Sequence, residues 1–142
     1  MNPIGKDIAE MLQTDIDGLT IGTNLFVTAL PNSPMDCISV YETSSQEPEV
    51  TQDKETIWND AVQVLVRATS FITAHTRCQQ VINSLHTFSN ELWNDTFYMQ
   101  IRMVNGPNSL MGQGEGKAHF LYSLNFRIQR NNTIDANPSI TI

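Results

Sequence analysis

Large apolar side chains occupy every second position of the segment 120–128, which reads FLYSLNFRI. Because side chains of a β-strand point alternately to the two faces of its sheet, this period of two predicts a strand with one buried face. The core row consists of Phe120, Tyr122, Leu124, Phe126 and Ile128, and the opposite row of Leu121, Ser123, Asn125, Arg127 and Gln129. The opposite row is polar with one charged residue, so it can face another protein surface as readily as water.

Four further segments predict strands, at residues 24–30, 38–43, 61–69 and 97–104. Both rows of the segment 61–69 are fairly apolar, which is typical of a strand in the middle of a sheet. The segment 44–60 is acidic and has little periodicity, so we expect a long exposed loop there. Residues 105–108 read Asn-Gly-Pro-Asn, which predicts a loop between the last two strands.

Two segments predict helices by their apolar spacing. Asn2 is placed as the N-cap and Pro3 as the first residue of a short helix that presents Ile4, Ile8 and Leu12 on one face. Ser70 is placed as the cap of a second helix, whose apolar stripe is Phe71, Ala74, Cys78, Ile82, Leu85 and Phe88. The other face of that helix carries only Arg77 as a charge, which a neighbouring subunit or ordinary solvation would explain equally well.

The element order predicts an α+β fold, with two helices packed on a sheet of about five strands. The sheet is expected to be mostly antiparallel, and the helical crossover leaves room for one parallel pair. We expect residues 1–130 to form a single domain and residues 131–142 to form an extended C-terminal arm, because that tail lacks a packing pattern.

The charge composition bears on the partners of the chain. Its 142 residues have a formal net charge of −7, and charged residues make up 16% of them, where about 25% is usual. Nucleic acids are held mainly by Lys and Arg, so this balance argues against a protein that grips DNA. Much of the polar surface must be uncharged, and such a surface tolerates burial in an assembly.

Targeting and redox signals are few. No apolar segment approaches the ~18 residues that cross a bilayer. The N-terminus lacks a secretory signal pattern, and the two cysteines, Cys37 and Cys78, lie far apart in the sequence. We therefore expect a cytosolic, reduced protein without a membrane partner.

Motifs that would indicate catalysis, metal binding or a cofactor are incomplete. The glycines before Lys117 fail the phosphate-loop pattern, because Met111 and Ala118 stand where it requires Gly and Ser or Thr. His75 and Cys78 are one helical turn apart but lack a second pair of ligands for zinc. Asp15, Asp17 and Gly18 begin like a calcium loop without its later ligands. We predict no catalytic residues, no metal and no cofactor, and hence no enzyme.

The order of several short segments resembles one protein family. These segments read DIAEML, LTIGTNLFVTALP, ISVYET, VQVLVRA and LMGQGEGKAHFLYSLNFRI, with an amphipathic helix before the last. The more specific pieces are Gly22, Asn24, Leu25 and Phe26, the segment 64–68, and Asn125, Phe126 and Arg127. Together they resemble the phage minor capsid and tail terminator family of long-tailed bacteriophages over residues 8–130. Gln113 and Gly114 depart from the family pattern, so contacts made by that loop are expected to differ.

The resemblance implies a structural virion protein at the head-proximal end of a phage tail, assembled in the host cytoplasm. Such a subunit forms a ring, typically of six copies, that docks on the tail tube protein, ends tube growth and helps join tail to head through a head-closure or neck protein. DNA would pass through the ring without being bound specifically. One alternative is a head-closure or neck connector protein, and a more distant one is a small soluble ligand-binding domain.

Candidate contact residues follow from composition within that picture. We predict that Arg67, Arg77, Asn125 and Arg127 contribute to subunit contacts. We predict that an acidic loop faces the lumen of the ring or a partner; its members are Glu47, Glu49, Asp53 and Glu55. Acidic residues in the lumen would keep passing DNA from sticking, since their charge repels phosphate.

Overall fold

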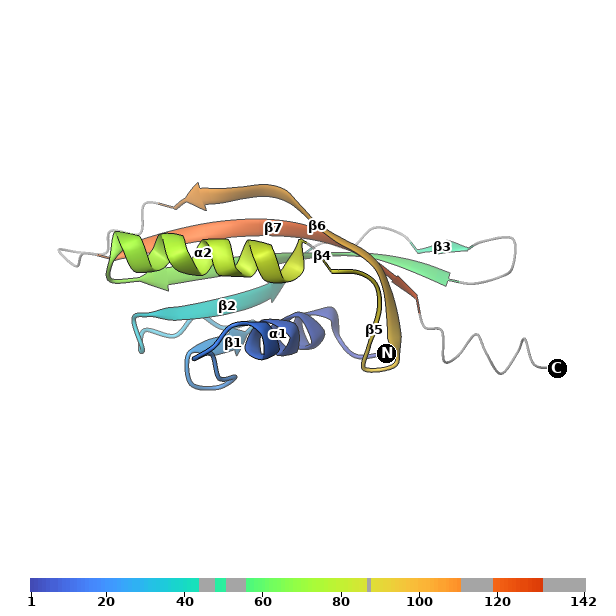
Figure 1. Cartoon of the computed structure of the whole chain (residues 1–142), viewed down its shortest axis with the longest axis horizontal. Coiled ribbons are helices and arrows are strands. Elements are labelled where there is room, and N and C mark those ends of the chain that lie inside the picture. Colours follow the sequence, from blue (N-terminus) through green and yellow to red (C-terminus); the bar gives the residue numbers. More distant parts are fainter. Residues whose placement is uncertain (44–47, 51–55, 87, 111–118, 132–142) are drawn as a thin grey trace.

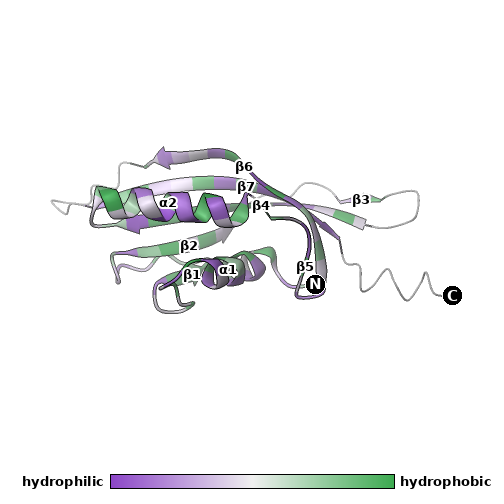
Figure 2. Cartoon of the chain, viewed as in Figure 1, coloured by the Kyte–Doolittle hydropathy of each residue, from purple (hydrophilic) through white to green (hydrophobic). Residues whose placement is uncertain are grey.

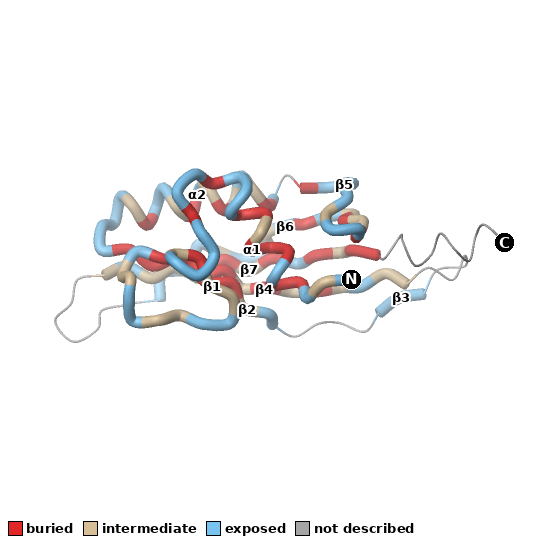
Figure 3. The backbone as a smooth tube through the Cα atoms, turned by 90° about the horizontal axis from the view of Figure 1, so that it is seen from below, coloured by how far each residue is buried: buried red, intermediate tan, exposed pale blue. Residues whose placement is uncertain are grey.

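The computed structural model describes residues 1–43, 48–50, 56–86, 88–110 and 119–131 (Figure 1). Within this part of the chain, helices α1 (Ile4–Asp15) and α2 (Phe71–Leu85) lie on one face of a single curved sheet. Seen from the side, both helices stand on one side of the strands (Figure 3). The α+β class predicted from the sequence is confirmed.

The described residues form seven strands, where the sequence predicted about five. They are β1 (Leu25–Val27), β2 (Cys37–Glu42), β3 (Glu49–Val50), β4 (Thr56–Ala68), β5 (Ser89–Trp93), β6 (Thr96–Ser109) and β7 (Phe120–Asn131). Their order in the sheet is β1-β2-β4-β7-β6-β5, and β3 pairs with β4. The parallel pair is β1 with β2, and every other pair is antiparallel. No helix lies between β1 and β2 in the chain, so this parallel pair does not arise from the helical crossover that the sequence suggested.

Strand β4 begins at Thr56, inside the segment that was expected to be an exposed loop. That expectation was wrong for residues 49–50 and 56–60, which are strand. The reason is the length of β7, which pairs with β4 from Phe120 opposite Ala68 to Asn131 opposite Ile57. Cross-strand pairing therefore extends β4 beyond the apolar alternation that marks its second half.

The sequence missed β5 and placed a loop within β6. Strands β5 and β6 are joined by Asn94 and Asp95, which have φ values of 48° and 63°. Two consecutive residues with positive φ match the twist of a two-residue hairpin. Further along β6, register shifts surround Gly106, whose φ is 121°. A Cβ at this position would lie 2.7 Å from the carbonyl oxygen of Ser123, so glycine lets the irregular strand stay against β7.

The hydrophobic core lies between the helices and the inner face of β2, β4, β7 and β6. Helix α1 buries Ile4, Ile8 and Leu12, as its spacing predicted, and α2 buries Cys78 and Leu85. The inner rows of the two central strands are buried as well; they consist of Val62, Val64, Val66, Leu124, Phe126 and Ile128. The predicted alternation is therefore confirmed along β4 and from Leu124 to Ile128 of β7. It does not hold at the start of β7, where Phe120 of the predicted core row is 36% exposed and Ser123 of the opposite row is buried.

The sequence predicted the N-cap of α2 correctly but not that of α1. Ser70 caps α2, since its Oγ accepts from the backbone N–H of Thr73 at 3.5 Å. Helix α1 instead begins at Ile4 with Pro3 as its N-cap and no side-chain cap. Asn2, which was expected to cap it, donates from Nδ2 to Asp7 Oδ1 at 3.3 Å. The Asn2 side chain therefore binds a buried carboxylate in place of the helix end.

Candidate assembly surface

A buried polar network lies at the end of the sheet where β4 begins and β7 ends. It consists of Asp7 on α1, Asp60 on β4, Tyr98 on β6 and Arg130 on β7, each less than 10% exposed. Arg130 Nε donates to Asp60 Oδ2 at 2.7 Å, and Tyr98 Oη donates to Asp7 Oδ2 at 2.5 Å. Arg130 Nη1 lies 3.8 Å from Asp7 Oδ2 and donates to the carbonyl of Asn2 at 2.9 Å.

This network fixes the N-terminus, α1 and three strands relative to one another. Burial is the main cause that raises the pKa of Tyr98, and its hydrogen bond to Asp7 raises it further. The hydroxyl therefore stays protonated and donates to Asp7. Local sequence patterns do not reveal this network, because the side chains that hydrogen-bond within it are 32 to 91 positions apart in the chain.

The sheet presents a helix-free surface on the side away from α1 and α2 (Figure 3). We call it the open face. On the central strands it carries the side chains that alternate with the core rows; they are Asn59, Ala61, Gln63, Leu65, Gln100, Arg102, Leu121, Ser123, Asn125, Arg127 and Gln129. Amides and small residues predominate there, and two arginines are the charged members of this set.

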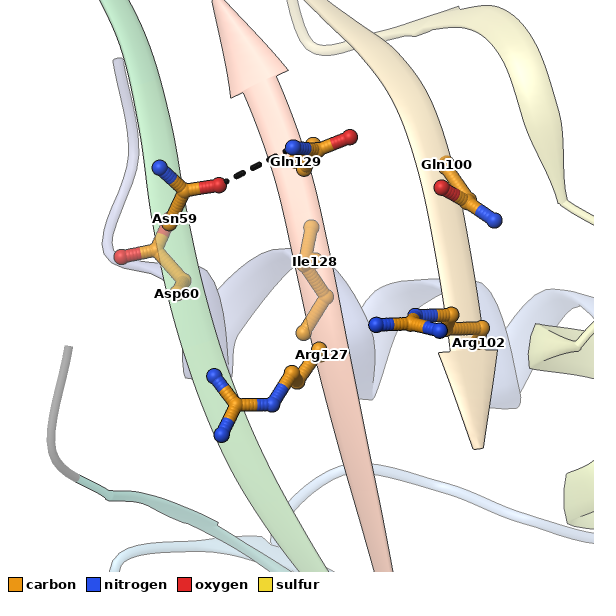
Figure 4. A pocket seen from close by; sticks show the side chains of 7 residues that line it. All are labelled: Asn59, Asp60, Gln100, Arg102, Arg127, Ile128 and Gln129. Atoms are coloured by element: carbon orange, nitrogen blue, oxygen red, sulfur yellow. Dashed lines mark hydrogen bonds between the residues drawn. The ribbon is translucent and has the colours of Figure 1, made fainter. Parts of the chain in front are cut away.

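A depression of about 590 Å³ lies on the open face across β4, β7 and β6 (Figure 4). Its lining residues are Asn59, Asp60, Gln100, Arg102, Arg127, Ile128 and Gln129. Gln129 Nε2 donates to Asn59 Oδ1 at 3.1 Å, and Asn59 Nδ2 donates to Glu49 Oε2 at 2.9 Å. Both guanidinium groups extend over the sheet surface in Figure 4, Arg127 from β7 and Arg102 from β6.

Two of the predicted contact residues lie on the open face. Arg127 is exposed, and Asn125 is half-buried opposite Gln63 of β4. Their neighbour Arg102 was not singled out in the sequence, although the alternation of β6 around Ile101 would have placed it on this face. Their part in subunit contacts stays a prediction.

Arg67 is buried, with 8% of its surface exposed, and its guanidinium is engaged within the chain. Nε donates to the carbonyl of Met35 at 2.9 Å, and Nη2 donates to the carbonyls of Pro34, at 2.9 Å, and of Pro31. Arg67 Nη2 also lies 3.4 Å from Cys37 Sγ. In the described structure, Arg67 therefore holds the connection between β1 and β2 against β4.

Arg77 is half-buried between the two helices. Its Nη1 donates to Gln80 Oε1 at 3.1 Å and to the carbonyl of Asp17 at 3.4 Å. Ser84 on the same side of α2 donates to Asp15 Oδ2 at 2.6 Å. The sparse charge on this side of α2 is therefore explained by α1 of the same chain, without a neighbouring subunit.

The predicted acidic loop falls mostly outside the described residues. Glu47, Asp53 and Glu55 lie there, and Glu49 is exposed on β3. Its role in facing a lumen or a partner stays a prediction.

Exposed apolar side chains gather where α2 begins and β7 begins. Phe71 is 54% exposed and Ile72 71% exposed, and the rings of Phe71 and Phe120 meet edge to face with centroids 5.8 Å apart. Figure 2 shows this end of α2 in the apolar colour. A cluster of this kind is common at contacts between proteins. The C-terminal part of the helix stripe predicted from the sequence is buried, but its first residue is not.

The residues weighed for zinc do not converge. His75 stacks on Phe71, while Cys78 and Cys37 are buried at separate places in the core. Within the described ranges, no group of three His, Cys, Asp or Glu side chains is arranged to hold a metal ion. No helix in the same ranges is long and apolar enough to span a bilayer.

Comparison with known proteins matches a family model and several solved structures. The model of the family described as bacteriophage tail terminator protein matches residues 12–132. A solved chain from the virion of a native gene transfer agent particle has a similar fold, with a TM-score of 0.56 and 13% identity. That match covers 90% of this chain and 94% of the other.

No curated protein matches the sequence. The family model covers most of the chain, including α2 and the central strands β4, β6 and β7. The chain belongs to the bacteriophage tail terminator protein family.

Proposed function

We propose that this chain forms a ring at the head-proximal end of a phage tail, where it ends growth of the tail tube and helps join the tail to the head. As a tail terminator family member it is a structural protein of the virion. The ring is expected to contain six copies and to contact the tail tube protein on one side and a head-closure or neck protein on the other. DNA passes through it without specific binding.

The observation that carries the proposal is the open face, a broad helix-free sheet surface on a subunit of a tail terminator family. Its amide side chains and sparse charge suit burial against protein, because few charged groups would lose their hydration. The opposite face differs, because α1 and α2 of the same subunit pack against it. A subunit whose faces differ in this way supports head-to-tail association, in which one patch meets a different patch of the next copy.

A non-enzymatic role agrees with the described side chains. The strongest polar cluster, formed by Asp7, Asp60, Tyr98 and Arg130, is buried and satisfied internally. The described residues that line the depression on the open face are amides, arginines, Ile128 and Asp60, whose carboxylate is bound to Arg130, and none of them is a nucleophile paired to a base.

Tails from a lysate that lacks this gene test the proposal. We expect tubes longer than normal, because nothing stops their growth, and we expect addition of the purified protein during assembly to restore normal length. Tails of normal length that fail to attach to heads would favour the head-closure or neck connector. Unaffected particles would contradict both roles.

A further inference from the structure

Arg102 and Arg127 stand directly opposite each other on the neighbouring antiparallel strands β6 and β7. Both are exposed, and neither makes a hydrogen bond or ion pair with any residue that the structure describes. Like charges directly opposite in a sheet destabilise the pairing of the strands. In the isolated subunit, this pair therefore carries an electrostatic cost that no contact among the described residues offsets.

The surroundings of the arginine pair supply further hydrogen-bond donors. The exposed amide of Gln100 lies two residues before Arg102 on the same face of β6. Gln129 lies two residues after Arg127 on the same face of β7 (Figure 4). Two carboxylates in the described part of β3 and β4 are engaged elsewhere, because Asp60 binds Arg130 and Glu49 accepts from Asn59. Two guanidinium groups beside amides suit a carboxylate ligand. Each guanidinium can donate two parallel hydrogen bonds to the two oxygens of a carboxylate.

We propose that the Arg102–Arg127 pair receives a carboxylate side chain from a second copy of this chain. This inference rests on the proposed ring and names one contact within it. A carboxylate bound between the guanidinium groups would remove their repulsion, so association would relieve the cost that the lone subunit carries.

Charge complementarity favours a second copy as the partner. The chain has fifteen acidic residues against eight basic ones, so another copy is a rich source of carboxylates. Exposed carboxylates occur away from the open face, on Asp17 after α1 and on Glu91 and Asp95 of the β5–β6 hairpin. None of these three side chains makes a hydrogen bond or ion pair among the described residues. A subunit with exposed arginines on one surface and exposed carboxylates on other surfaces has the two different, complementary patches that a head-to-tail interface joins.

The first experiment replaces both arginines by glutamine, Arg102→Gln with Arg127→Gln, and compares the variant with the wild type. Removing the like-charge pair should leave the free energy of unfolding of the subunit unchanged or higher. Association of copies at the tail end should weaken by at least about 30-fold, which corresponds to ~2 kcal/mol for a buried charged contact. The double Lys variant, which keeps both charges, should lose less. Equal association of the glutamine variant and the wild type would overturn the inference.

A second experiment identifies the partner directly. The photoreactive residue benzoylphenylalanine replaces Gln100 in assembled particles, and mass spectrometry identifies what is crosslinked to it. We expect a crosslink to a second copy, near Asp17, Glu91 or Asp95. A crosslink to a different protein, to DNA or to nothing would overturn the inference.

The two inferences can fail separately. Rings at tail ends that form as readily in the glutamine variant as in the wild type would remove the arginine contact and leave the terminator role intact. Wild-type particles without several copies at the tail end would remove both.

Discussion

The Arg130 guanidinium of β7 forms a buried ion pair with the Asp60 carboxylate of β4, and the Nε–Oδ2 distance is 2.7 Å. Arg130 also forms an ion pair with Asp7, whose Oδ2 lies 3.8 Å from Arg130 Nη1. One cation therefore compensates two buried carboxylates, and it does so at the junction of α1, β4, β6 and β7. The network ties the N-terminus to the last strand of the domain.

Arg130→Met should lower the free energy of unfolding by about 3–5 kcal/mol, because it removes a buried cation that is ion-paired with two buried carboxylates. Urea unfolding of the purified chain measures this difference. Arg127→Met on the same strand is the matched control, and its effect should stay within about 0.5 kcal/mol because Arg127 is exposed. Equal effects of the two substitutions would contradict a stabilising role for the network.

Arg67→Lys should destabilise the fold by about 1–3 kcal/mol, although the charge is kept. An ammonium group cannot reproduce the fork that donates to the carbonyls of Pro31, Pro34 and Met35. Thermal unfolding, together with limited proteolysis of the β1–β2 connection, tests this expectation. Arg102→Lys serves as the control, since Arg102 makes no such contacts among the described residues. A wild-type melting curve for Arg67→Lys would show that the fork is dispensable.

Burial raises the pKa of the Cys78 thiol from 9.0 to about 11. Below pH 9 the thiol is protonated in both folded and unfolded chains, so it adds no pH dependence. Between pH 9 and 11 the unfolded chain releases this proton and the folded chain retains it, so stability falls by about 1.4 kcal/mol per pH unit.

Cys78→Ala isolates this contribution. Between pH 8 and pH 10 the unfolding free energy of the variant should fall by about 1.4 kcal/mol less than that of the wild type. Urea unfolding at the two pH values measures both. Parallel pH profiles would mean that the thiol titrates normally in the folded chain.

The four acidic residues proposed to face the lumen or a partner are Glu47, Glu49, Asp53 and Glu55. Replacing all four by Lys should slow DNA ejection if they line the lumen, because basic side chains attract the passing phosphates. Replacement by Gln, which removes the charge without reversing it, should have a smaller effect. Unchanged ejection from normally assembled particles of the Lys variant would remove the lumen assignment.

Local patterns in the sequence predicted the elements that bury one face. The period of two in residues 120–128 placed β7 correctly, and apolar spacing placed both helices, because burial on one face imposes those periods. The strand ends that these patterns missed are set by pairing between strands that are distant in the sequence. Strand β4 extends back to Thr56 because β7 continues to Asn131 opposite it, and neither end has a clear apolar alternation.

The candidate site was predictable only where local alternation determines which face of the sheet a side chain is on. Alternation placed Asn125 and Arg127 on the polar row of β7, but the position of Arg127 opposite Arg102 depends on the register of β6. Arg67 belongs to a similar row on β4, yet it is buried because the connection between β1 and β2 folds over it. Alternation in the sequence predicts on which face of the sheet a side chain lies. Whether a loop covers that side chain depends on tertiary packing, which the alternation does not predict.

Cryo-electron microscopy of tail ends tests the central claim most directly. We predict a closed ring of six copies of this chain at the head-proximal end of the tube, with the open face of each subunit covered by protein. A tail end without this chain, or with a single isolated copy whose open face contacts solvent, would contradict the account.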